Sequence, residues 1–117
     1  MLGTRDKKTQ YRQIIKQIMQ DFHQRLSGKR ITERKSLILD DATGQYLILN
    51  NYWKGQSRYY GIVIHIELQS DGKIWLQHDG TDLIVGQSLL DVGIPKSDIV
   101  LGFHAPIRRT NTGFAVA

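Results

Sequence analysis

The chain has 117 residues and no cysteine, with 40% hydrophobic and 23% charged residues. This length fits a single domain spanning residues 1–117 that buries a core without staples, and the lack of cysteine excludes disulfides and thiolate metal sites. No apolar run approaches the roughly 20 residues of a membrane span, and the first residues lack the apolar region of a signal peptide. We therefore expect a cytoplasmic protein with no membrane contact.

The net charge of +5 is concentrated at one end of the chain. Residues 1–35 hold ten Lys or Arg and three Asp or Glu, a balance of +7, whereas residues 36–117 hold six and eight, a balance of −2. A segment this basic indicates an anionic partner, which is nucleic acid, an acidic protein face or a membrane surface.

Apolar residues at helical spacing predict a long amphipathic helix over residues 7–27, with Gly28 as its C-terminal cap. The stripe consists of Tyr11, Ile14, Ile15, Ile18, Met19, Phe22 and Leu26. We expect this stripe to pack on a sheet.

Six basic residues are the candidate contact with nucleic acid or with a protein partner. They are Arg12, Lys16, Lys29, Arg30, Arg34 and Lys35. The first two lie on the polar face of the predicted helix, and the other four continue the run of positive charge beyond it. A solvated surface explains the same pattern, so the residues alone leave both interpretations open.

Residues 58–79 predict a long β-hairpin at the centre of a sheet. Its first arm alternates, which places Tyr60, Ile62, Ile64, Ile66 and Leu68 together on one face of the predicted strand. The pair Asp71-Gly72 supplies the turn, and residues 73–79 form the return arm.

Two further strands are predicted before this hairpin, at residues 36–40 and 45–53. Because short loops join the four strands, they predict an antiparallel meander. After Gly80, Thr81 or Asp82 is expected to cap a shorter helix that ends at Gly93. A turn of helix at residues 95–98 and an extended tail over residues 102–117 are expected to follow.

The predicted fold class is therefore α+β. We expect a two-layer sandwich in which an antiparallel β-meander of about four strands carries the long N-terminal helix and a shorter helix after the sheet. The second face of this sheet is also apolar, with Leu47, Leu49, Val63 and Trp75 assigned to it, and we predict a homo-oligomer formed through the sheet.

Several aromatic residues suit stacking on unpaired bases, namely Trp53, Tyr59, Tyr60 and Trp75. Aromatic residues at strand spacing are more often part of a core or a subunit interface, which is the simpler interpretation.

The sequence contains no convincing catalytic set. His65-x-Glu67 resembles the start of a zinc-deaminase motif, but the second half of that motif requires cysteine. Asp71-Gly-Lys73 has a spacing found in nucleases, yet it falls on the predicted hairpin tip, where the glycine favours a turn. No phosphate-binding glycine loop is present. We therefore predict a protein that is not an enzyme and that holds no metal and no cofactor.

Several stretches carry the pattern of a known family. They are Gly61-Ile-Val-Ile-His-Ile66, Gly72-Lys-Ile-Trp-Leu-Gln-His-Asp-Gly-Thr81, Gly93-Ile-Pro-Lys-Ser-Asp-Ile-Val-Leu-Gly-Phe-His104, Thr112-Gly-Phe-Ala-Val-Ala117 and, near the N-terminus, Tyr11-Arg-Gln-Ile-Ile-Lys16. On these residues the chain resembles the XisI family, cyanobacterial controlling factors for excision of the fdxN element. His104-Ala-Pro106 departs from the His-Pro-Pro of the family pattern, which bears on the path of the tail.

The resemblance implies a small two-layer α+β domain that works in site-specific excision of a DNA element. It implies a site-specific recombinase and a nuclease-like XisH protein as partners, and it assigns no catalytic or ligand residues. Two functions stay open: a non-catalytic controlling factor that contacts DNA through its basic face, and an adaptor or inhibitor of a XisH-type nuclease that does not bind DNA directly.

Overall fold

The computed structural model describes residues 4–27, 34–81, 84–110 and 112–117. Its centre is a five-stranded sheet in the order β1-β2-β3-β4-β5. The strands are β1 (Lys35–Asp40), β2 (Gln45–Lys54), β3 (Ser57–Leu68), β4 (Ile74–Asp79) and β5 (Ile99–Leu101). The first four strands pair antiparallel, as their short loops predicted.

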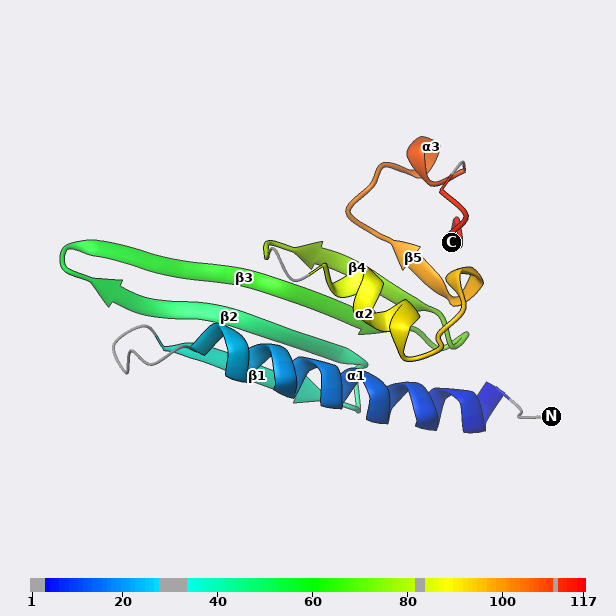
Figure 1. Ribbon diagram of the computed structural model, residues 1–117, viewed down its shortest axis with the longest axis horizontal. Coiled ribbons are helices and arrows are strands. Elements are labelled where there is room, and N and C mark those ends of the chain that lie inside the picture. The colour runs from blue at the N-terminus through cyan, green and yellow to red at the C-terminus, as the bar shows by residue number, and fades with distance from the viewer. Residues whose placement is uncertain (1–3, 28–33, 82–83, 111) are drawn as a thin grey trace.

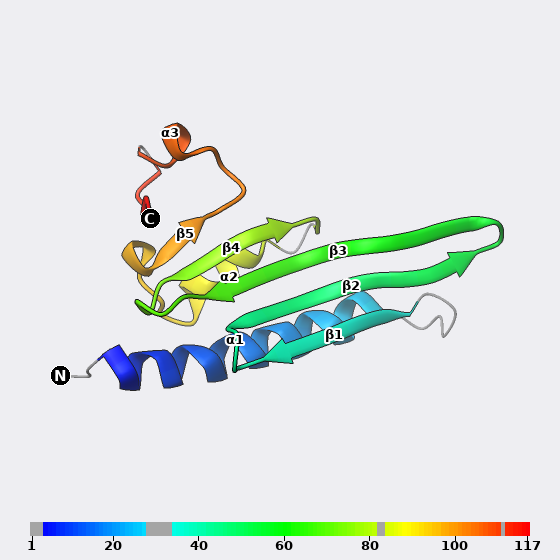
Figure 2. The same ribbon diagram turned by 180° about the vertical axis from the view of Figure 1, so that it is seen from behind.

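Helices α1 (Thr4–Ser27) and α2 (Val85–Asp91) lie on the same side of the sheet, which confirms the two-layer α+β class (Figure 1). The apolar stripe of α1 buries Ile15 and Met19 completely, against strand residues such as Ile48 and Ile64 that are also fully buried. Viewed from behind, the strands lie in front of both helices (Figure 2). One face of the sheet therefore carries the helices and the core.

The sheet is mixed, not purely antiparallel, because β5 adds a fifth strand parallel to β4. Ile74 pairs with Ile99 and Leu76 with Leu101. The chain reaches this position through α2 and the short 3₁₀ helix η1 (Lys96–Asp98), a crossover of the length that a parallel pair requires. The sequence predicted about four strands, one fewer than the sheet contains.

The second helix begins later than predicted, at Val85, so Thr81 is not its cap, and Asp82 lies outside the described residues. Asp79 at the end of β4 caps the helix instead, because its Oδ2 accepts a hydrogen bond of 2.9 Å from the Val85 N–H. Its Oδ1 accepts one from the Thr81 hydroxyl. Gly28, the predicted cap of α1, also lies outside the described residues.

The predicted alternation of β3 is wrong in its first half, because a bulge interrupts the strand at Val63. Ile48 pairs with Ile64 and Leu49 with Ile62, which leaves Val63 as an extra residue. Val63 and Ile64 are both buried, whereas Ile62 is 46% exposed. Val63 therefore lies on the helix side, and Tyr60 and Ile62 move to the opposite face.

No helix in the described residues combines the length and the apolar character needed to cross a membrane.

Candidate interaction surfaces

The candidate basic residues are placed at two separate points of the fold. Lys16 lies beside the β1–β2 turn, where its Nζ forms an ion pair of 2.8 Å with Asp41 Oδ2. Arg12 lies near the same carboxylate, since its charge helps to lower the pKa of Asp41 after the hydrogen bonds from Lys16 and Tyr46. The negative charge of Asp41 therefore partly neutralises Arg12 and Lys16.

Arg34 and Lys35 lie at the other end of β1, about 17 Å away along the strand. Arg34 is exposed, and its carbonyl accepts a hydrogen bond of 3.4 Å from the Asn51 N–H. Lys35 Nζ lies 5.3 Å from the centroid of the Tyr52 ring. Lys29 and Arg30 lie outside the described residues, and a contact role for all six residues stays a prediction.

The hairpin of β2 and β3 extends beyond the rest of the sheet (Figure 1). Strand β1 pairs with β2 only as far as Asn50, and β4 pairs with β3 only from Ile64 onward. Residues 51–60, here called the ribbon, therefore pair only with each other among the described strands. A two-stranded ribbon is marginally stable in water by itself, so its side chains must support it.

Aromatic residues and cations hold the ribbon on both faces. On the helix side, the rings of Tyr52 and Tyr59 stack at 5.1 Å with an angle of 11° between their planes. On the opposite side, the Arg58 guanidinium lies 5.5 Å from the centre of the Trp53 ring and 5.1 Å from that of Tyr60. These contacts order side chains that remain exposed, with Tyr60 at 69%.

The sheet face away from the helices, here called the open face, carries an apolar surface that continues onto the ribbon. Directly paired residues of an antiparallel sheet share a face, and the pairs Ile38–Leu47, Leu49–Ile62 and Trp53–Arg58 fall on this one. Ile38 is 41% exposed. No described helix covers these strands on this side (Figure 2).

Val63 does not belong to this face, contrary to the sequence prediction, because the bulge turns it toward α1. Leu47 and Leu49 do belong to it and are half-buried. Trp75 also faces this side, but Arg109 of the helix α3 (Pro106–Arg109) lies 5.0 Å from its ring centre. The tail is thus only partly extended, and it returns to the sheet where Ala115 bridges Val100.

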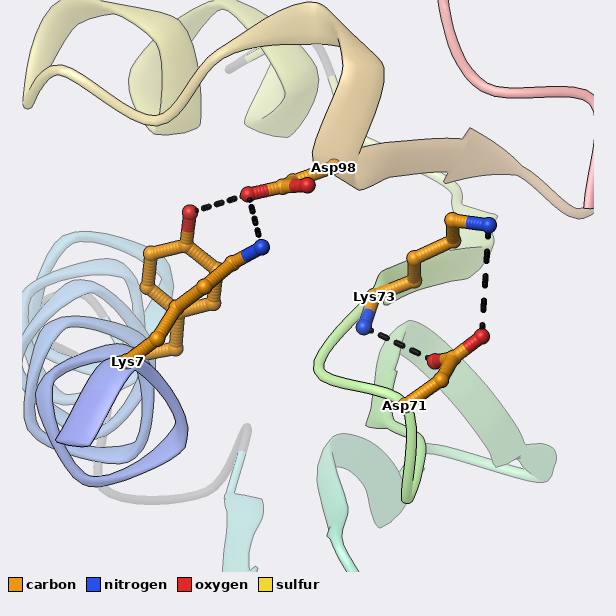
Figure 3. Close-up of polar contacts among 5 residues, drawn as sticks. Lys7, Asp71, Lys73 and Asp98 are labelled. Carbon is orange, nitrogen blue, oxygen red and sulfur yellow. Dashed lines mark hydrogen bonds and ion pairs between the residues drawn. The ribbon is translucent and has the colours of Figure 1, made fainter. Parts of the chain in front are cut away.

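A cluster of polar residues ties the start of α1 to η1. Asp98 Oδ2 accepts hydrogen bonds from the Tyr11 hydroxyl at 2.5 Å and from Lys7 Nζ at 2.8 Å. Figure 3 shows Lys7 and Asp98 pointing toward one another from these two elements. Burial acts to raise the pKa of Asp98, but the two hydrogen bonds and the positive charge of Lys7 outweigh it and lower that pKa. Burial and Asp98 together raise the pKa of Tyr11.

Asp71 and Lys73 form the β3–β4 turn, as their sequence predicted (Figure 3). The Lys73 N–H donates to Asp71 Oδ1 at 3.0 Å, and Lys73 Nζ lies 4.0 Å from Asp71 Oδ2. Both contacts hold the turn together.

His65 and Glu67 are linked on the open face through Gln45. His65 Nε2 lies 2.6 Å from Gln45 Oε1, and Gln45 Nε2 donates to Glu67 Oε2 at 2.6 Å. Burial lowers the pKa of His65. Gln69 donates to the second oxygen of Glu67. Within the described residues, no three His, Asp or Glu side chains lie close enough together to hold a metal ion.

A cavity of about 420 Å³ lies between the end of α1 and the start of the ribbon. Leu26, Asn50 and Val63 contribute to its lining. Asn50 Oδ1 is buried and has no hydrogen-bond partner among the described residues. Among the described residues that line this cavity, Lys35 is the one cation.

The comparisons with known proteins agree on one family. The profile of the XisI protein family matches residues 5–116. A solved XisI-like protein from Anabaena variabilis ATCC 29413 has 34% identity and a TM-score of 0.88, over 94% of this chain and 99% of that one. A second structure from the same organism, the fdxN element excision controlling factor XisI, has 38% identity and a TM-score of 0.82, over 95% and 99%. No protein among the curated sequences matches significantly.

The chain belongs to the XisI family, as the long motif from Gly93 to His104 indicated.

Proposed function

We propose that this chain takes part in controlling the excision of a DNA element of the fdxN type, and that it does so by binding and not by catalysis. The observation that carries the proposal is its 38% identity, over 95% of its length, to a protein described as an fdxN element excision controlling factor. Fold alone does not fix function, so the sites must be consistent with this role.

Three acidic side chains of the described residues support a binding role, because each is held by contacts within the fold. Asp98 is held by Tyr11 and Lys7, and Asp41 by Lys16 and Tyr46. Glu67 accepts hydrogen bonds from two glutamine side chains. A general acid or base needs access to the proton that it transfers, and these carboxylates are occupied by structural contacts.

In this proposal the recombination chemistry resides in a site-specific recombinase, and a nuclease-like XisH-type protein is the second protein partner. DNA is contacted by the basic residues at the start of β1. Arg34 and Lys35 are favoured over Lys16, because Lys16 is already paired with Asp41.

A second function is favoured by the same ion pair. With Lys16 neutralised and Arg12 beside the same carboxylate, the helix offers less positive charge to phosphates than its sequence suggested. The chain would then be an adaptor or inhibitor of the XisH-type nuclease with no direct contact with DNA.

A gel-shift experiment separates the two functions. If DNA is bound, a duplex carrying the element border is shifted at about 50 mM salt, and affinity falls with a log–log slope of roughly −0.9 per phosphate contact. Replacing Arg34 and Lys35 by Gln should weaken the shift, whereas Arg108→Gln, an exposed arginine far along the chain, should not. Co-purification with the XisH-type protein and no shift at low salt would favour the adaptor.

The excision role itself is tested in cells that carry such an element. Deleting the gene for this chain should change the frequency of the excised junction, measured by quantitative amplification, and a plasmid copy should restore it. An unchanged frequency after deletion would contradict the proposal.

A further inference from the structure

The open face has an aliphatic centre and two ends of opposite charge. At its centre lie Ile38, Leu47, Leu49 and Ile62, contributed by three neighbouring strands. The ribbon end carries Trp53, Tyr60 and Arg58.

The charges of the two ends are segregated along the chain. Residues 42–66 contain no Asp or Glu at all, so the ribbon end is purely basic. At the other end, Asp40 and Glu67 both pair with Gln45 and therefore share the open face with it. Arg58 and Glu67 are about 30 Å apart along β3.

We infer that the open face is an interface between two copies of this chain, related by a two-fold axis that passes close to Ile62. Such an axis pairs a surface with itself. The sequence midpoint between Arg58 and Glu67 falls between Ile62 and Val63, and Ile62 is the one of these two that faces the partner. The ribbon of one copy then lies over the carboxylate end of the other, and the aliphatic centres meet.

The same surface fits a nucleic acid less well. Bases stack on aromatic rings, but on this face the rings lie at the ribbon end and at Trp75, which Arg109 covers, and the centre offers only aliphatic side chains. Asp40 and Glu67 would repel a phosphate backbone that ran along the face. A second copy fits opposite charges at opposite ends, because the basic end of each copy then meets the acidic end of the other.

Packing of this kind is that of a β-sandwich, in which two sheets bury their apolar faces against each other about 10 Å apart. It would also cover the ribbon, whose large side chains are otherwise exposed. This inference does not depend on the proposed role in excision.

The first test is the mass of the full chain in solution, measured by light scattering at micromolar concentration. We expect twice the 13.4 kDa of one chain. Ile62→Glu places a carboxylate at the two-fold axis and should give a single-chain mass with an unchanged circular dichroism spectrum. Val92→Glu is the matched control, because Val92 is 52% exposed and follows α2 on the helix side of the sheet; it should leave the doubled mass intact.

The second test exchanges charges between the two ends. In Arg58→Glu, the ribbon end of each copy becomes acidic and faces the acidic end of the other copy. In Glu67→Arg, two basic ends face each other in the same way. Each variant alone should therefore show mainly the single-chain mass. Mixing the two variants should restore it, because each contact then joins a carboxylate to an arginine.

A single-chain mass for the unmodified protein would overturn the inference. So would a doubled mass that survives Ile62→Glu, or a mixture of folded charge variants that stays at the single-chain mass. Quenching of tryptophan fluorescence by a thymidine oligonucleotide, in a protein that keeps the single-chain mass, would assign the face to nucleic acid instead.

Discussion

Gly44 shows how one residue shapes the sheet. It has a φ of +70°, and a Cβ atom on it would lie 2.2 Å from the carbonyl oxygen of Leu68. The Leu68 N–H donates to the Gly44 carbonyl at 2.8 Å, so the turn after β1 is held against the end of β3. A side chain at this position meets both backbone strain and a direct clash.

We therefore predict that Gly44→Ala lowers the free energy of unfolding by more than the roughly 1–2 kcal/mol of left-handed strain alone. Gly55→Ala is the control, because Gly55 has a φ of +61° but no described atom within 4 Å of the position that an alanine methyl group would take. Denaturant titration of both variants measures the difference. Equal losses would mean that the turn can move away from Leu68.

Asp98 gives the clearest pH dependence. Its folded pKa is below its ordinary value, so the unfolded chain binds the proton more readily. The stabilisation is complete above the unfolded pKa of about 3.9 and is lost as the pH falls from there through the folded pKa.

Asp98→Asn should therefore reduce the free energy of unfolding near pH 7 by about 1.5–3 kcal/mol, the range for a hydrogen bond to a charged group. The difference in the free energy of unfolding between the variant and the unmodified protein should become smaller as the pH falls below about 4. Urea titrations at several pH values check this, with Asp91→Asn as an exposed control. A gap that stays constant down to about pH 2 would show that the charge of Asp98 is not involved.

At the scale of elements, the ribbon depends largely on its own side chains because neither β1 nor β4 pairs with it. The stacked pair Tyr52 and Tyr59 is its main contact on the helix side. An aromatic pair of this kind contributes about 0.5–1.5 kcal/mol beyond the area it buries.

We predict that Tyr59→Ala makes amide hydrogen exchange of residues 51–60 faster by about an order of magnitude. Exchange in the paired stretch from Ile64 to Leu68 should change little, which supplies an internal control. Unchanged exchange in the ribbon would mean that the stacking does not stabilise it.

The elements that the sequence predicted best are those whose signal is local. The stripe on α1 and the alternation of β2 each follow a regular period, and both form as expected. The bulge at Val63 was missed because both faces of β3 carry apolar residues, so a shift by one residue leaves the pattern looking the same. Strand β5 was missed as a sheet member because a three-residue strand in parallel pairing depends on distant contacts.

At the scale of the whole molecule, the candidate contact residues were harder to predict than the fold. Charge density along the sequence joined Lys16 and Lys35 into one basic run. In the fold they lie at opposite ends of β1, and Lys16 forms an ion pair with Asp41. Arg58 was not singled out, although its position between Trp53 and Tyr60 makes it a central feature of the ribbon. Only the strand register places these three together.

The central claim is that the chain controls excision through its surfaces and not through a reaction centre. The most direct test is the frequency of the excised junction in cells whose chromosomal copy carries either Ile62→Glu or His65→Gln. We predict that Ile62→Glu reproduces the effect of deleting the gene, whereas His65→Gln, which removes the most central titratable group of the open face, keeps the normal frequency. Loss of control with His65→Gln and normal control with Ile62→Glu would contradict the claim.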